Sequence, residues 1–144
     1  METEFKEIYR LFLSSVDDYE LADVDEDELK DVLEGYLLNA MAQLQSSMVD
    51  VSDFDLENSK FNVNLSHLEK VALAKAMKLE WVGEKLYSAD LMRKSIGDRD
   101  YKAVQGTDYL RQLGIMDLRL RKEIDRLLID YSYTDKDQMG GLWS

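Results

Sequence analysis

The chain has 144 residues, a length typical of one globular domain. Its 30 Asp and Glu against 18 Lys and Arg give a formal charge of −12 at pH 7, which argues against binding a nucleic-acid backbone or an anionic membrane surface. Cysteine is absent, which excludes disulfides, thiolate zinc sites and cysteine nucleophiles, and no apolar run has the length of a membrane span. We therefore expect a protein made in the cytoplasm and used there or in an assembly built there.

Helical patterns occupy the first third of the chain, and proline, the strongest helix breaker, is absent. We expect a first helix over residues 4–14 and a second over residues 25–45, because apolar residues recur there at helical spacing. Acidic residues from Asp23 to Glu28 crowd the start of the second helix, where the helix dipole favours negative charge. The predicted apolar faces comprise Phe5, Ile8, Tyr9, Phe12 and Leu13 in the first helix, and Leu29, Val32, Leu33, Tyr36, Leu37, Ala40, Met41 and Leu44 in the second.

The segment 49–63 has a different period, in which apolar residues alternate with acidic residues and asparagines around Asn58-Ser59. A short β-hairpin and an extended loop fit this pattern equally well. Ser66 followed by Glu69 forms a capping box, so a third helix is expected to begin there and to end between residues 83 and 87. Its apolar residues are Leu68, Val71, Ala72, Met77, Leu79 and Val82.

The last part of the chain predicts a short helix over 88–95 capped by Ser88, a loop bracketed by Gly97 and Gly106, and a long final helix over 107–131. Gly114 is the weak point of that helix, since a glycine in a helix interior costs up to about 1 kcal/mol relative to alanine. Its apolar positions are Leu110, Leu113, Leu120, Ile124, Leu127 and Tyr131, while Arg119, Arg121, Lys122 and Arg126 lie on the opposite faces.

The predicted fold is therefore an all-α, compact bundle of about four to five helices with a long C-terminal helix. An extended or hairpin-like insertion separates the second and third helices. We expect a single helical domain over residues 1–133 and an irregular C-terminal tail over residues 134–144 that binds a partner. No internal repeat or second domain is evident in the sequence.

Candidate chemical sites are weak throughout the sequence. His67 is the only histidine and stands in the first turn of a helix, without the partners that a zinc site or a catalytic base requires. The acidic group from Asp23 to Glu28 lacks the spacing and the central glycine of a calcium loop, and the helix dipole explains it more simply. A basic group near Tyr101 and Tyr109 is interleaved with Asp98, Asp100 and Asp108, which favours surface ion pairs over nucleic-acid binding; it comprises Lys94, Arg99, Lys102 and Arg111. We expect no catalytic residues, no metal and no cofactor.

The tail is the strongest candidate for a binding site. Trp143 follows a glycine pair outside any predicted helix, and tryptophan is strongly enriched among residues that anchor protein interfaces. An accidental tryptophan in a disordered terminus is the competing interpretation. We expect the tail to dock on another chain through Met139, Gly140, Gly141, Leu142 and Trp143.

The order of elements from about Phe5 to Tyr133 supports a family resemblance. It comprises a short aromatic helix, an acidic-start helix ending near Leu44, Phe61-Asn62-Val63-Asn64-Leu65-Ser66 with Glu69 opening a third helix, Trp81, the Asp100-Tyr101 step, and a long helix closing on Tyr131-Ser132-Tyr133. This order resembles small head–tail connector (adaptor or neck) proteins of tailed bacteriophages, chiefly those infecting Gram-positive bacteria. The similarity lies in the overall pattern and involves no diagnostic motif.

The resemblance implies a virion structural protein that forms a ring below the portal and extends the DNA channel toward the tail. Its partners would be other copies of itself, the portal protein, and tail or neck proteins, and DNA would pass without specific binding. Such proteins carry no enzyme activity and no cofactor, and they commonly use a terminal extension to hold the portal or a neighbouring subunit. The matching extension here is Met139 to Trp143.

Two other functions fit the sequence less well. A small acidic inhibitor that mimics DNA or counters a host defence would need one continuous acidic face, whereas Lys and Arg interrupt every predicted helix. A helical metal-dependent nucleotide hydrolase would need inward carboxylates at i, i+3 or i+4 on two helices, and the sequence does not show that pattern. The connector is therefore the favoured prediction.

Overall fold

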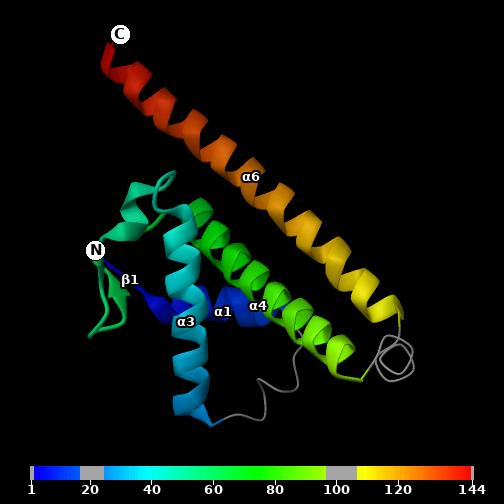
Figure 1. Ribbon diagram of the computed structural model, residues 1–144. Coiled ribbons are helices and arrows are strands. Elements are labelled where there is room, and N and C mark those ends of the chain that lie inside the picture. The colour runs from blue at the N-terminus through cyan, green and yellow to red at the C-terminus, as the bar shows by residue number, and fades with distance from the viewer. Residues whose placement is uncertain (1, 17–24, 97–106, 144) are drawn as a thin grey trace.

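Helix α4 (His67–Ile96) forms the centre of the fold, and the other helices pack around it (Figure 1). The computed structural model describes residues 2–16, 25–96 and 107–143, with the side chains of 89–96, 107–109 and 134–143 outside that description. Within these ranges α4 packs against α1 (Phe5–Ser15), α3 (Glu26–Leu44) and α6 (Thr107–Trp143). The predicted all-α bundle with a long C-terminal helix is confirmed.

The first helix contributes four buried residues to one continuous core, and they are Phe5, Ile8, Tyr9 and Phe12. Phe5 and Phe12 pack edge to face against aromatic rings from distant segments. The Phe5 and Phe61 ring centroids lie 5.1 Å apart, and those of Phe12 and Tyr36 lie 5.8 Å apart. The predicted face of α1 is confirmed except at Leu13, which is 37% exposed. The helix thus brings the N-terminus of the chain against both α3 and the strands.

Helix α3 begins after Asp25, and its first turn carries Glu26, Asp27 and Glu28, as the dipole argument predicted. Most of its predicted apolar face is buried, and the buried residues are Leu33, Tyr36, Leu37, Ala40, Met41 and Leu44. Leu29 is only partly buried and Val32 is 37% exposed, because the first two turns of α3 extend past the core. The acidic start of α3 is therefore a projecting end.

The segment 49–63 contains a short 3-10 helix (Val49–Ser52) and a β-hairpin, which settles the two alternatives left open by its sequence. Strand β2 (Phe54–Asp55) pairs antiparallel with β3 (Lys60–Phe61), and β1 (Thr3–Glu4) pairs with the other edge of β3. Strand β1 was not predicted from the sequence. This small sheet fastens the N-terminus of the chain to the hairpin.

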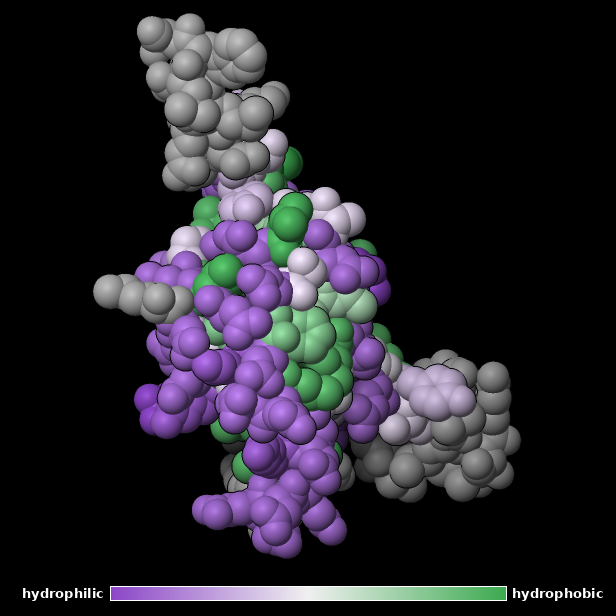
Figure 2. All heavy atoms as spheres, turned by 90° about the vertical axis from the view of Figure 1, so that its left-hand side faces the viewer, coloured by the Kyte–Doolittle hydropathy of each residue, from purple (hydrophilic) through white to green (hydrophobic). Residues whose placement is uncertain are grey.

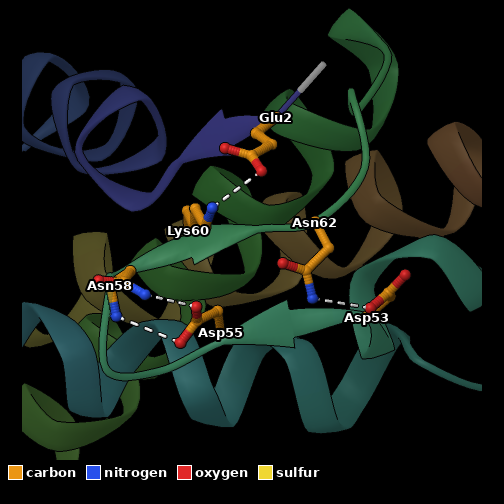
Figure 3. A network of polar contacts seen from close by, with 6 residues as sticks. All are labelled: Glu2, Asp53, Asp55, Asn58, Lys60 and Asn62. Atoms are coloured by element: carbon orange, nitrogen blue, oxygen red, sulfur yellow. Dashed lines mark hydrogen bonds and ion pairs between the residues drawn. The ribbon is translucent and has the colours of Figure 1, made fainter.

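Side-chain contacts hold the hairpin together (Figure 3). The Asn58 amide donates to the Asp55 carboxylate at 2.7 Å, which lowers the Asp55 pKa, and the Asn62 amide donates to Asp53 at 2.9 Å. The Lys60 ammonium lies 2.8 Å from the Glu2 carboxylate, and this hydrogen bond raises the Lys60 pKa. The polar side chains of the hairpin thus have their partners within the hairpin or in the N-terminal segment at β1.

The predicted capping box opens α4. The Ser66 backbone N–H donates to the Glu69 carboxylate at 3.0 Å, and the Glu69 backbone N–H donates to the Ser66 hydroxyl at 3.2 Å. The Thr3 hydroxyl accepts the backbone N–H of Leu65 at 2.9 Å, so the chain's N-terminus also fixes this helix start.

The prediction of a separate helix over residues 88–95 is wrong, because α4 continues without a break to Ile96. Gly83 was expected to lie near the end of the helix, but a side chain added there would meet nothing within 4 Å, and the helix passes through it. Ser88 lies on an exposed turn within the helix and does not cap a new one. One long helix replaces the two that were expected.

Helix α6 is continuous through Gly114, as predicted, but it also runs past residue 133 to Trp143. The irregular tail expected over 134–144 is therefore wrong over 134–143, and the expected boundary at residue 133 lies within a helix. The absence of proline explains how the helix can continue, and two glycines cost it only about 1 kcal/mol each. At about 1.5 Å per residue, its 37 residues span roughly 55 Å.

Candidate functional site

Helix α6 has two apolar faces, and the described residues cover only one of them. Leu113, Leu120 and Ile124 point into the bundle and are 3–6% exposed. Seven other residues, each three or four positions after the last, form what we call the outward stripe on the opposite side. They are Arg111, Ile115, Leu118, Lys122, Arg126, Ile129 and Tyr133.

All seven residues of the outward stripe are exposed. Its four apolar members are unusually open, with Leu118 62%, Ile129 56%, Ile115 47% and Tyr133 64% accessible to solvent. Its three charged members are all basic, and none forms an ion pair with another described residue. Single exposed apolar residues are common, but four aligned on one helix face indicate an interaction surface.

The stripe continues along a helix that leaves the bundle. α6 runs antiparallel to α4, and its C-terminal part extends past the first turns of α4 (Figure 1). The described end of the stripe, at Tyr133, lies beyond Leu128 and Tyr131, which still pack against the core. A second chain therefore has access to it.

A basic cavity borders the stripe. It lies between α1, α4 and α6 and has a volume of about 320 Å³. Lys75, Lys78 and Arg119 line it together with Glu123, and the Lys75 ammonium lies 2.7 Å from the Glu123 carboxylate. Burial, followed by repulsion from Lys75, lowers the Lys78 pKa. The apolar part of its lining comprises Leu11, Val71, Ala74, Met116 and Leu120.

Negative charge is concentrated at the start of α3. Five exposed carboxylates stand in its cap and first two turns, against the single cation Lys30. Figure 2 shows hydrophilic residues over the lower end of this face, where α3 begins. The carboxylates belong to Asp25, Glu26, Asp27, Glu28 and Asp31, and none pairs with a cation among the described residues.

A polar groove of about 390 Å³ lies between α3, α4 and α6, and its carboxylates all have donors. The Tyr36 hydroxyl donates to Glu84 at 2.7 Å, and the Gln43 amide donates to Glu80. Arg121 pairs with Asp117 at 3.0 Å across one turn of α6. The first two contacts join α3 to α4 across the groove.

The candidate sites predicted from the sequence lie on different elements of the structure. His67 is exposed at the start of α4, as expected, and the acidic residues of α3 are solvated. Tyr101, Asp98, Asp100, Arg99 and Lys102 lie outside the described residues, as do the side chains of Lys94, Asp108 and Tyr109. The backbones of Met139, Gly140, Gly141, Leu142 and Trp143 belong to α6, but the contacts of their side chains lie outside the description.

The described residues form neither a metal cluster nor a membrane span. No three or more His, Cys, Asp or Glu side chains among them are placed to hold a metal ion. No described helix is both long and apolar enough to cross a membrane.

The outward stripe was missed from the sequence, although its signal is present. Ile115, Leu118 and Ile129 do not lie on the stripe of Leu113, Leu120 and Ile124, and they share the face on which the sequence placed Lys122 and Arg126. A helix with apolar residues on two opposite faces indicates two neighbours. The described part of the bundle supplies one of them.

Comparison with known proteins gave no relative. The chain matches no protein-family model, no curated protein and no solved structure at a significant level.

Proposed function

We propose that this chain is a structural subunit of a protein assembly, and that the assembly is the joint between head and tail of a tailed bacteriophage. In this role the chain forms a ring below the portal, extends the DNA channel toward the tail and performs no catalysis. Its partners are other copies of itself, the portal protein, and tail or neck proteins.

The observation that carries the proposal is the outward stripe of α6. Burying one large apolar side chain is worth roughly 1.5–3 kcal/mol, so Leu118, Ile129 and their neighbours favour contact with another chain. A ring multiplies such contacts, because the last ones form within an already joined assembly. A modest surface on each copy is then sufficient for a firm joint.

The charge of the chain supports the choice of a DNA conduit. Each copy carries −12 at pH 7, so a ring of copies repels the DNA phosphates that pass through it. Clustered cations in the lumen would hold the genome by releasing counterions. In this assignment the surface that lines the channel is acidic, and the basic stripe lies in a contact between proteins.

The C-terminal part of α6 is proposed as a second contact. Met139, Leu142 and Trp143 are large apolar residues near the end of a helix that departs from the bundle. In this proposal they dock on the portal or on a neighbouring subunit.

Interrupting the gene in its parent genome tests the function. We expect filled heads and free tails to accumulate unjoined, as seen by electron microscopy, and the wild-type gene supplied separately to restore joined particles. Normal yields of joined particles without the gene would contradict the proposal. Intact particles that had become sensitive to a host defence would support the inhibitor alternative.

A further inference from the structure

We infer that the outward stripe of α6 binds the acidic start of α3 from a second copy of the chain, so that copies join head to tail. The inference rests on the proposed assembly function and names the two surfaces that meet. It follows from the charge, the exposure and the placement of described residues on α3, α4 and α6.

The receiving surface groups several cations on an acidic protein. Arg111, Lys122 and Arg126 lie on the stripe itself, and Arg119 lies beside it at the cavity with Lys75 and Lys78. The nearby carboxylate of Glu123 is already paired with Lys75, and Asp125 flanks the stripe. A partner that docks here must present carboxylates together with apolar or small residues.

The start of α3 has that chemistry. Glu28 and Asp31 lie on the outer face of α3, away from the buried side chains of Leu33 and Tyr36, and Val32 beside them is 37% exposed. Gly35 follows on the same face, and a side chain added there would meet nothing within 4 Å. A neighbouring helix can therefore approach closely, with cations over the carboxylates and apolar residues over Val32 and Gly35.

The placement of the two surfaces decides how the copies join. α3 and α6 both pack on α4, and their outward faces turn away from it, so one copy does not bring its own surfaces together. A contact between two different surfaces repeats from copy to copy, and it closes into a ring or continues as a filament. Pairing two α6 stripes instead would set three cations of one copy against three of the other.

Charge reversal tests the contact. One variant carries Lys122→Glu with Arg126→Glu on α6, and the other carries Glu28→Lys with Asp31→Lys on α3. Each variant alone should self-associate about tenfold or more weakly than wild type at low salt, measured by sedimentation velocity over a concentration series. Mixing the two variants should restore association, because each reversed surface then meets a complementary one.

Matched controls separate specific contacts from net charge. Lys6→Glu with Arg10→Glu makes the same change at the same spacing on exposed positions of α1, and Asp50→Lys with Glu57→Lys matches the α3 variant. Both controls should associate as wild type does. Circular dichroism of every variant should show unchanged helix content.

Several results would overturn the inference. These are a wild-type chain that stays monomeric at low salt, variants that associate as well as wild type, or a mixture that stays dissociated. Weaker association of the α6 variant alone, with the α3 variant unaffected, would also overturn the inference, because the stripe would then meet a different surface of the second copy. If the interrupted gene still yields unjoined heads and tails, the proposed function stands even where this inference fails.

Discussion

The Lys75 ammonium on α4 lies 2.7 Å from the Glu123 carboxylate on α6, and this ion pair joins the two longest helices at the edge of the basic cavity. Both side chains are about a third exposed, so the pair itself contributes less than about 1 kcal/mol. Its larger effect is local, because Glu123 is the only carboxylate among the residues that line the cavity, and three cations surround it.

Replacing Lys78 should stabilise the fold slightly. Burial and the neighbouring Lys75 lower the Lys78 pKa below its ordinary value of 10.5, so the folded chain disfavours the charged ammonium. Lys78→Met should raise the free energy of unfolding at pH 7 by well under about 1 kcal/mol, since water still screens the group. As pH rises toward 10.5, the free energy of unfolding of the wild type should rise relative to that of the variant. The reason is that the unfolded wild-type chain then binds more protons than the folded one. Urea unfolding from pH 7 to 10.5 measures both effects, and an unchanged difference would contradict the assignment.

Tyr9 should respond to pH in the opposite direction. Its hydroxyl is buried without a hydrogen bond to any described residue, and burial, then the Glu34 charge, raises the pKa above its ordinary value of 10.0. Above that pH the unfolded chain loses the proton that the folded chain keeps, so the free energy of unfolding falls. Tyr9→Phe should remove this fall and add about 1 kcal/mol at pH 7, because an unsatisfied buried hydroxyl is lost. A variant less stable than wild type at pH 7 would show that the hydroxyl has a partner.

The capping box at the start of α4 should be measurable as a single interaction. Ser66→Ala removes the acceptor of the Glu69 backbone N–H and should cost about 1 kcal/mol. Ser66→Asp keeps an acceptor at that place and should stay close to wild type. Thermal unfolding of the three chains gives the comparison, and equal melting temperatures would mean that the cap contributes nothing to stability.

Ser59 holds a backbone conformation that suits glycine. Its φ is +53° in the turn between β2 and β3, and its carbonyl accepts the Phe5 backbone N–H at 2.9 Å. Ser59→Gly should stabilise the chain by up to about 1 kcal/mol, because relief of the left-handed strain exceeds the extra entropy of the unfolded glycine chain. Ser59→Val should destabilise it. Denaturant unfolding decides, and the reverse order would contradict the backbone argument.

The sequence predicted the helices best where a local signal was strong. Ser66 and Glu69 identified the start of α4 because a capping box uses contacts within four residues. The ends of helices were predicted less well, since Gly83 and Ser88 were taken to mark an end and a start, and the Gly140-Gly141 pair was placed in an irregular tail. Local propensity of this size is overridden when the helix continues to pack or to extend.

The candidate site depended on contacts that no local pattern encodes. Ile115 and Ile129 were available in the sequence as apolar residues, but only the placement of α4 shows which face of α6 is covered. The cavity around Lys78 likewise joins α1, α4 and α6, which are distant in the sequence. The acidic start of α3 was predicted, whereas its role as a projecting end required the fold.

The central claim is that the outward stripe of α6 holds this chain in a head–tail joint. Its most direct test is the Leu118→Glu, Ile129→Glu variant, supplied to a parent genome that lacks the wild-type gene. Both residues are more than half exposed, so the variant should fold, and we predict that heads and tails remain unjoined in electron micrographs. The control Val49→Glu, Leu56→Glu changes two exposed apolar residues away from α6 and should restore joined particles. Joined particles at wild-type yield with the stripe variant would contradict the account.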